Sequence, residues 1–204
     1  MPCSAPAMSA RKLRKQVYVS STFSDLEQHR AHLKLALEKA GYDVECMERY
    51  PAFDERPADK CLADVAACDI YVVLVALRYG YVPADDNPEG KSITEMEYDK
   101  AVETGRPRLA FMLDIDDEDF GWPPKRCDKD WQVADSKIAR FRERVGTERG
   151  RELFTTADSL ATAVLQALSQ KERDELPAGE RDYAKIRTSY LDWLRRECDS
   201  VELL

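Results

Sequence analysis

Residues 16–30 read Gln-Val-Tyr-Val-Ser-Ser-Thr-Phe-Ser-Asp-Leu-Glu-Gln-His-Arg, and this stretch decides the fold. The β-branched and aromatic run 17–19 predicts a strand, which ends at the hydroxyl residues Ser20, Ser21 and Thr22. A helix pattern begins at once. In an open α/β fold, a turn between a strand and a helix lies at the carboxyl edge of the sheet, where ligands bind. Backbone N–H groups and hydroxyls at this edge suit a phosphate or another anion.

Strand and helix patterns alternate along the rest of the chain. Strands are predicted at 16–20, about 42–47, 70–76, 108–113 and 152–155. Such alternation indicates a parallel sheet with helices on both faces, and right-handed crossovers leave few topologies. We expect an α/β, flavodoxin-like three-layer sandwich whose five-stranded parallel sheet has the order 2-1-3-4-5. In this order a switch point separates the first and third strands.

Two Ser-x-x-Glu sequences predict where helices begin. In such a capping box the serine side chain accepts a hydrogen bond from the first turn, and the glutamate reaches back to the serine N–H. Ser24 with Glu27 predicts the start of the first helix, and Ser92 with Glu95 predicts the start of the third.

The domain boundaries follow from composition. Residues 1–15 are expected to form a disordered leader, 16–170 the α/β domain, and 171–204 a charged linker and a helix. The linker contains the helix breakers of the sequence Pro-Ala-Gly at 177–179, and the helix after it carries aromatic bulk. We infer that this helix leads into a downstream module absent from the chain. Packing of the helix back onto the same domain is an alternative of equal weight.

Charge and cysteine use exclude several classes of protein. A net charge of −8 argues against a broad nucleic-acid footprint, and the basic cluster within 11–15 is interpreted as a solvated leader. No apolar segment precedes this cluster, and the longest apolar run, 70–77, is too short to span a bilayer. Six scattered cysteines without a C-x-x-C pair indicate reduced thiols. We expect a cytoplasmic protein that binds neither membrane nor nucleic acid.

Residues that could ligate a metal are sparse. The chain has two histidines, His29 and His32, and both are predicted on the surface of the first helix. A zinc site or a Ser-His catalytic pair therefore has little support. The acidic run within 114–119 is interpreted as a solvated loop, and a divalent-cation site is the alternative. We expect no metal site.

Three familiar catalytic or nucleotide-binding motifs are absent. The chain contains no G-x-x-x-x-G-K-[ST], no G-x-G-x-x-G and no G-x-S-x-G. These absences argue against a P-loop ATPase, a dinucleotide-dependent dehydrogenase and an α/β-hydrolase.

The remaining candidates gather at one predicted edge of the sheet. The hydroxyl run 20–22 follows the first strand, Arg78, Tyr79 and Gly80 follow the third, and Glu95 begins the next helix. Arg78 offers a planar fork for a phosphate or carboxylate, and Gly80 allows a sharp turn. A carboxylate in such a crevice can stabilise the oxocarbenium-like state of glycosyl transfer. We therefore take Glu95 as the candidate catalytic residue.

Each candidate also has a structural interpretation. Glu95 stands three residues after Ser92, so capping alone accounts for it. Ser20 and Thr22 can satisfy the backbone of the turn, and Arg78 can pair with a nearby carboxylate.

Two aromatic residues near the same edge could contribute to binding. Either Tyr79 or Tyr81 can stack on a base.

Four blocks, taken in order, resemble an uncharacterised-domain family found at the N-terminus of STAND and NACHT-type signalling ATPases. The resemblance covers about residues 15–170, and the tail around 190–194 resembles the segment that leads into the ATPase module. The blocks are VYVSSTFSDL at 17–26, MERYPAFDERP at 47–57, CDIYVVLVALRYG at 68–80 and KSITEMEY at 91–98.

That family is similar to TIR domains and to nucleoside 2-deoxyribosyltransferases, which act at an N-glycosidic bond. The resemblance implies that Glu95 is the catalytic glutamate and that Ser20 and Ser21 contact the ligand. Glu97 stands where the transferases usually have glycine. The resemblance also implies that NAD or a related nucleotide is a substrate rather than a cofactor.

Two hypotheses therefore remain open at this point. In the first, a TIR-like effector or signalling domain binds NAD or a related nucleotide and hydrolyses its N-glycosidic bond. A deoxyribosyltransferase-like reaction is a variant of this hypothesis. In the second, the domain is a non-enzymatic module that makes homotypic or partner contacts and is coupled to an ATPase.

Overall fold

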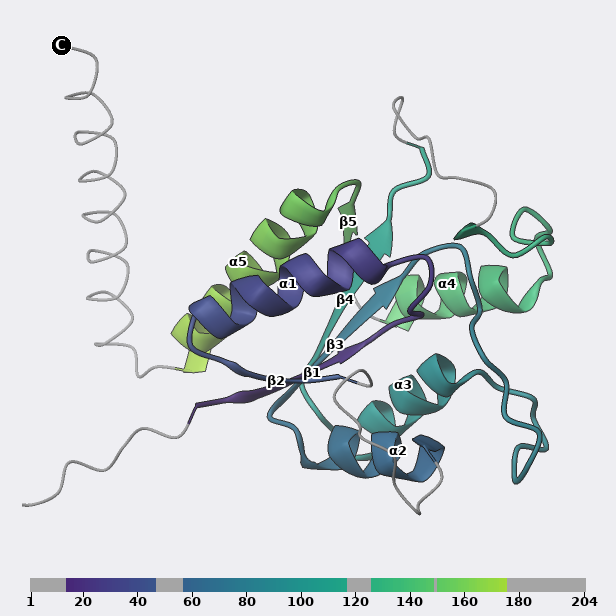
Figure 1. Ribbon diagram of the computed structural model, residues 1–204, viewed down its shortest axis with the longest axis horizontal. Coiled ribbons are helices and arrows are strands. Elements are labelled where there is room, and N and C mark those ends of the chain that lie inside the picture. Colours follow the sequence, from purple (N-terminus) through teal and green to yellow (C-terminus); the bar gives the residue numbers. More distant parts are fainter. Residues whose placement is uncertain (1–13, 47–56, 117–125, 149, 176–204) are drawn as a thin grey trace, which may run out of the picture. The chain divides into compact units, whose positions relative to one another are not determined.

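The computed structural model describes residues 14–46, 57–116, 126–148 and 150–175 (Figure 1). Strands and helices alternate throughout these ranges. The strands are β1 (Gln16–Ser20), β2 (Asp43–Glu45), β3 (Ile70–Val75), β4 (Arg108–Leu113) and β5 (Arg151–Phe154). The helices are α1 (Glu27–Lys39), α2 (Pro57–Ala67), α3 (Ile93–Glu103), α4 (Lys137–Glu148) and α5 (Ala157–Glu175).

The five strands form one parallel sheet in the order β2-β1-β3-β4-β5. The predicted fold class and strand order are therefore confirmed. After β1 the chain adds β2 on one side and then returns to place β3 on the other side of β1. This reversal creates the switch point, because the connections leaving β1 and β3 diverge to opposite faces of the sheet.

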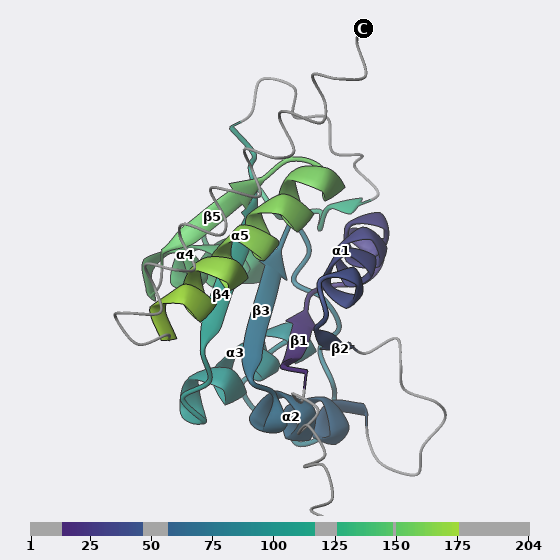
Figure 2. The ribbon, with the colours of Figure 1, turned by 90° about the vertical axis from the view of Figure 1, so that its left-hand side faces the viewer.

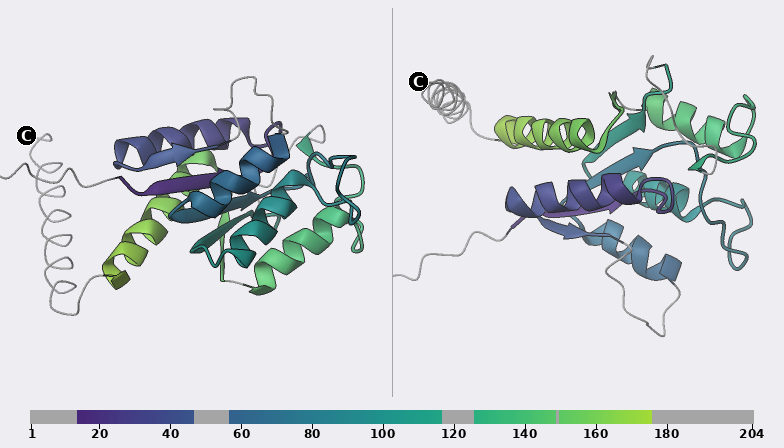
Figure 3. Two further views of the ribbon diagram at one scale, coloured as in Figure 1. Left: turned by 90° about the horizontal axis from the view of Figure 1, so that it is seen from below. Right: turned by 45° about the horizontal axis from the view of Figure 1, so that its top comes forward.

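The chain divides into two compact units, Met1–Ala163 and Val164–Leu204. The first unit contains the sheet and the helices from α1 to α4. Helix α1 covers one face of the sheet, while α2, α3 and α4 lie on the opposite face (Figures 2 and 3). The described residues of the second unit belong to α5.

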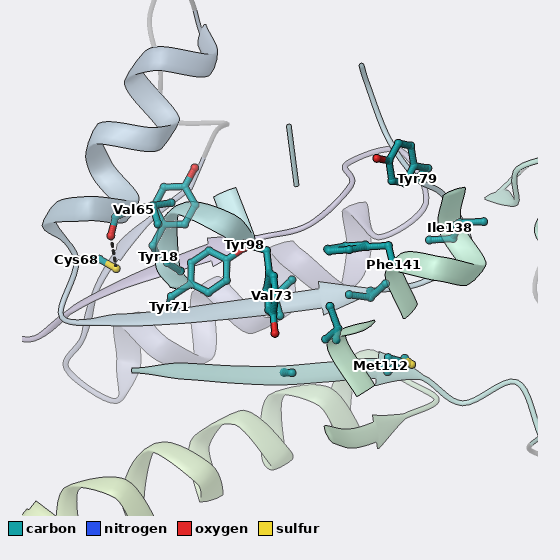
Figure 4. Packing of buried hydrophobic residues seen from close by; sticks show 14 residues of the cluster. Tyr18, Val65, Cys68, Tyr71, Val73, Tyr79, Tyr98, Met112, Ile138 and Phe141 are labelled. Carbon is teal, nitrogen blue, oxygen red and sulfur yellow. Dashed lines mark hydrogen bonds between the residues drawn. The ribbon is translucent and has the colours of Figure 1, made fainter. Parts of the chain in front are cut away.

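An aromatic layer forms the core between the sheet and the helices α2, α3 and α4 (Figure 4). Tyr18 and Tyr71 stack with ring centroids 6.2 Å apart, and Tyr98 meets Phe141 edge to face at 5.9 Å. All six residues of β3 are buried, as expected for the central strand of a parallel sheet. Burial of large aromatic rings supplies much of the apolar area that stabilises such a fold.

The two predicted capping boxes have different outcomes. Ser92 caps α3, and its hydroxyl accepts a hydrogen bond from the Glu95 N–H at 3.3 Å. The predicted start of α1 at Ser24 is wrong, because α1 begins at Glu27 with Leu26 at the N-cap and no side-chain cap. A turn closed by the Leu26 N–H on the Phe23 carbonyl, at 3.1 Å, occupies the intervening residues.

His29 is buried, which corrects the prediction of a surface residue. Its ring lies 5.6 Å from the Phe154 ring, because α1 turns this face toward the end of β5. His32 is exposed and pairs with Asp158 at 3.1 Å.

Helix α5 continues to Glu175, so residues 171–175 of the predicted linker are helical. Residues 1–13 of the predicted leader, and the predicted terminal helix, lie outside the described residues. Of the helices in the described ranges, none has the length and hydropathy needed to cross a bilayer.

Candidate functional site

A pocket of about 650 Å³ opens at the carboxyl ends of β1 and β3, at the switch point of the sheet. We name it the β1–β3 pocket. Its volume falls within the usual range of small-molecule sites. The turn after β1, the loop after β3, and the helices α1 and α3 contribute its walls. The described lining residues are Tyr18, Val19, Ser20, Ser21, Thr22, Phe23, Ser24, Arg30, Arg78, Gly80, Tyr81, Ile93, Thr94 and Glu97.

The three hydroxyl residues after β1 all line this pocket. Ser20 is buried, and its hydroxyl donates to Glu97 Oε2 at 2.5 Å. Ser21 Oγ donates to the Thr22 carbonyl at 2.9 Å and accepts from Arg30 Nη1 at 2.5 Å. The turn is therefore held from two sides, by a carboxylate of α3 and a guanidinium of α1.

Gly80 brings the loop after β3 against the turn after β1. Its φ is +96°, a conformation that side-chain-bearing residues rarely adopt. A Cβ atom at this position would lie 2.9 Å from Thr22 Cγ2, which is closer than such atoms approach. Glycine is therefore needed here both for the backbone conformation and for the close approach of the two pocket walls.

Of the two neighbouring residues Arg78 and Tyr79, only Arg78 lines the pocket. Arg78 lines the pocket, and its Nε lies 3.7 Å from Asp128 Oδ1. Tyr79 is buried outside the pocket, where its ring meets Phe141 edge to face at 6.5 Å and its hydroxyl donates to Glu95. Burial, and then the hydrogen bond to Glu95, raises the pKa of Tyr79 to about 12.

Tyr81, two residues further along, lines the pocket with 71% of its surface exposed. Of the two tyrosines considered for base stacking, Tyr81 is therefore the one that the loop places at the pocket.

Glu95 lies at the interface of α3 with α4 and is absent from the residues that line the pocket. Its carboxylate accepts from the Tyr79 hydroxyl and from Arg144 Nη1, the latter at 3.4 Å. The carboxylate therefore neither reaches back to Ser92 nor faces Ser20 and Arg78. The structure brings Ser20, Ser21, Thr22, Arg78 and Gly80 together but does not bring Glu95 or Tyr79 to them.

Glu97 is the carboxylate that lines the pocket, and it is 3% exposed. The Tyr18 hydroxyl donates to Oε1 at 2.7 Å, and the Ser20 hydroxyl donates to Oε2 at 2.5 Å. Burial raises the pKa of Glu97. Hydrogen bonds from Ser20, Tyr18 and the Cys61 thiol, with the positive charge of Arg30, oppose that rise. These contacts fix a carboxylate in one orientation at the base of the pocket.

A second buried tyrosine, Tyr71, is influenced by the charge of this carboxylate. Tyr71 is fully buried, and its ring stacks on that of Tyr18. Burial, and after it the charge of Glu97, raises the pKa of Tyr71 well above its usual value of 10. Tyr71 therefore stays a neutral phenol beside the carboxylate.

The burial of Glu97 could have been predicted from the periodicity of α3, although not from the Ser-x-x-Glu motif. The buried residues of α3 are Ile93, Thr94, Glu97, Tyr98 and Ala101. This spacing is the inward stripe of an amphipathic helix. An acidic residue on such a stripe needs partners inside the protein, so the stripe itself indicates that Glu97 is a buried, partnered carboxylate.

Metal ligands do not gather anywhere in the part of the chain that the structure describes, where no group of three His, Cys, Asp or Glu side chains is placed to hold an ion. Asp114 and Asp116 of the acidic run form a local turn, in which the Asp116 N–H donates to Asp114 Oδ1 at 3.0 Å. The remainder of that run lies outside the described residues.

The sheet order and the position of the pocket define a flavodoxin-like α/β domain with a pocket at its switch point, where domains of this class bind ligands. The chain belongs to the family described as "Domain of unknown function (DUF4062)", whose pattern matches residues 16–169. No curated protein matches the chain in sequence.

Solved structures share the fold at low sequence identity. The TIR domains of the activated Roq1 resistosome, which directly recognizes the pathogen effector XopQ, are 13% identical with a TM-score of 0.50, over 76% of this chain and 99% of that one. The TIR-like character of the fold is therefore confirmed.

Two further structures match less closely. The CMP N-glycosidase BcmB of Clostridium botulinum is 12% identical with a TM-score of 0.43, over 74% of this chain and 98% of that one. A 2-desoxiribosyltransferase from Leishmania mexicana is 14% identical with a TM-score of 0.37, over 66% and 99%.

Proposed function

We propose that the β1–β3 pocket binds NAD or a related nucleotide and that the domain hydrolyses its N-glycosidic bond. The observation that carries this proposal is Glu97, a buried carboxylate held by two hydroxyl donors at the base of a pocket of about 650 Å³. The pocket wall also carries Arg78, whose planar guanidinium suits a phosphate. Tyr81 at the pocket offers an aromatic face on which a base can stack.

The chemistry follows from charge. As the C–N bond breaks, its electron pair goes to the leaving base and positive charge develops on the ribose. The ionised carboxylate of Glu97 stabilises this oxocarbenium-like state. A water molecule then adds its oxygen to the anomeric carbon and releases a proton to the solvent, which leaves the ribose with a hydroxyl group. The hydrogen bonds from Tyr18 and Ser20 orient the carboxylate and favour its ionised form against the effect of burial.

Glu97 rather than Glu95 is the reacting carboxylate in this proposal. Residues two apart on a helix do not share a face, and Glu95 is engaged with Tyr79 and Arg144 at the interface with α4. Ser20, Ser21, Thr22 and Gly80 then shape the wall that meets the ribose and phosphates.

The experiment is to incubate concentrated protein with NAD and to measure nicotinamide release. We expect wild type to release nicotinamide and Glu97→Gln to lower the rate by about a hundredfold or more. Glu95→Gln is the matched comparison, because it makes the same chemical change two residues away in the same helix. A greater loss of activity in Glu95→Gln than in Glu97→Gln would assign the catalytic role to Glu95. No nicotinamide release by wild type would contradict the proposed hydrolase activity. Supplying a second base tests transfer in place of hydrolysis.

The wider role proposed is that of an N-terminal effector or signalling domain of a STAND or NACHT-type defence protein. The support is the resemblance of the four sequence blocks to domains that precede such ATPases. In this role the domain self-associates, and an attached ATPase controls its activity. Chemical cross-linking of the domain joined to such an ATPase, with and without nucleotide for the ATPase, tests this arrangement.

A non-enzymatic interaction module is the second candidate, and one observation favours it. Both oxygens of Glu97 already accept hydrogen bonds from protein hydroxyls, which is also how a structural buried carboxylate is satisfied. Isothermal titration calorimetry with NAD, nucleosides and nucleotides separates the two candidates. Micromolar binding that Arg78→Ala abolishes supports the nucleotide site, whereas no heat from any of these ligands supports the module.

A further inference from the structure

A second, smaller pocket lies beside the β1–β3 pocket, between α1 and the edge strand β2. We name it the α1–β2 pocket, and its volume is about 230 Å³. That volume is below the roughly 300 Å³ at which small-molecule sites usually begin, so it has room for part of a ligand rather than for a whole one. Its described lining residues are Val19, Phe23, Glu27, Arg30, Ala31, Lys34, Val44 and Cys46.

The two pockets share a wall. Val19, Phe23 and Arg30 line both of them, and Arg30 is the charged residue among the three. Arg30 is buried, and its Nη1 donates to Ser21 Oγ at 2.5 Å and to the Ser21 carbonyl at 3.4 Å. The cation therefore has a fixed position at the junction.

The charged residues that line the α1–β2 pocket all come from α1. Lys34 stands four residues after Arg30 on α1, so the two cations are neighbours on one face of the helix. Two adjacent cations suit the two charges of a pyrophosphate. Glu27, one turn before Arg30, offers an acceptor for a hydroxyl or an exocyclic amino group. The rest of the described lining is apolar, as the face of a base requires.

We propose that the α1–β2 pocket is a second subsite for the same ligand, and that the ligand is a dinucleotide rather than a mononucleotide. One base and its ribose lie in the β1–β3 pocket beside Glu97. The pyrophosphate lies against Arg30 and Lys34, and the second base lies between Ala31 and Val44. This inference rests on the proposed function for nucleotide binding but not for bond cleavage.

The test compares NAD with nicotinamide mononucleotide, which has the same N-glycosidic bond and the same leaving group. Dissociation constants are measured by calorimetry on the Glu97→Gln variant, so that neither ligand is consumed. We expect NAD to bind at least about tenfold more tightly. Ala31 is exposed and lines the smaller pocket, so Ala31→Trp fills that pocket without crowding the core. In this variant the ratio of the two dissociation constants falls to about one.

Leu35→Trp is the control, because Leu35 is 51% exposed on the same helix and lines neither pocket. It should keep the preference for NAD. Equal binding of both ligands, or a preference that Ala31→Trp leaves intact, overturns the second subsite while the proposed function stands. Tight and selective binding without nicotinamide release by wild type overturns the cleavage reaction and keeps the subsite. No binding of either ligand overturns both.

Discussion

Ser20 and Glu97 are 77 positions apart in the chain, and the Ser20 hydroxyl donates to Glu97 Oε2 at 2.5 Å. This contact joins the end of β1 to the second turn of α3 across the switch point. It requires β1 and β3 to be neighbours, so that the helix following β3 packs beside the turn following β1. The sheet order therefore assembles the pocket and supplies the carboxylate with its hydroxyl partner.

Ser20→Ala should slow nicotinamide release and move its acid limb to higher pH. The Ser20 hydrogen bond opposes the rise in the pKa of Glu97 that burial causes. Removing the donor lets that pKa rise further, so a larger fraction of the enzyme is protonated and inactive at a given pH. The pH dependence of kcat/KM measures the shift. Tyr18→Phe should act in the same direction, and an acid limb that moves to lower pH in either variant contradicts the assignment.

The stability of the protein should also depend on the ionisation of Glu97. Its pKa in the folded protein is raised above the ordinary 4.5, so the folded state binds the proton more tightly than the unfolded state. The contribution of Glu97 to stability therefore grows as pH falls from the raised value toward 4.5 and is lost as pH rises.

Urea unfolding of wild type and Glu97→Gln across this pH range checks the sign. The difference in unfolding free energy between the two proteins should change in favour of wild type as pH falls. A difference that stays constant with pH would show that Glu97 has the same pKa in the folded and unfolded states.

The fold could be predicted from the sequence because local patterns of residues determine its strands and helices. The buried run of β3 and the boundaries of β4 at Arg108–Leu113 follow from apolar composition. Alternation of strands and helices then restricts the topology to very few choices. The predicted start of a helix was wrong where the sequence pattern was ambiguous. At Ser24 the capping sequence precedes a turn and not the helix itself.

The residues of the β1–β3 pocket could be predicted from the sequence only in part. The hydroxyl turn, Arg78 and Gly80 adjoin strand ends, and the carboxyl ends of neighbouring parallel strands meet at one edge. Glu95 and Glu97 could not be separated by spacing, because both stand near the start of the same helix. Which of them faces the pocket depends on the rotation of α3 against β1, and that rotation is fixed by contacts such as Tyr18 with Glu97 that join distant parts of the chain.

Gly80→Ala should destabilise the protein by about 1–3 kcal/mol. Alanine at φ +96° is strained, and its Cβ meets Thr22 Cγ2 at 2.9 Å. Thr22→Ser removes that methyl group, so the double variant should recover the part of the loss that comes from the collision and retain the part due to backbone strain. Chemical denaturation of the two single variants and the double variant measures both parts. Strict additivity of the single losses would argue against contact between the two positions.

Arg144→Gln should weaken the junction of α3 with α4 in a manner that depends on salt. The guanidinium lies 2.6 Å from Asp99, 2.9 Å from Glu148 and 3.4 Å from Glu95. Because the arginine is about one-third exposed, we expect a loss near 1 kcal/mol at low ionic strength and a smaller loss in high salt.

Arg140→Gln is the matched control for this prediction. Arg140 lies on the same helix and pairs with Asp135 at 3.5 Å, but both partners are mostly exposed. Such a pair contributes little to stability, so unfolding by urea should be unchanged. If Arg140→Gln costs as much as Arg144→Gln, or if added salt leaves the Arg144 effect at full size, the loss comes from general changes to α4. In that case Arg144 is not the electrostatic link that keeps Glu95 at the α3–α4 interface.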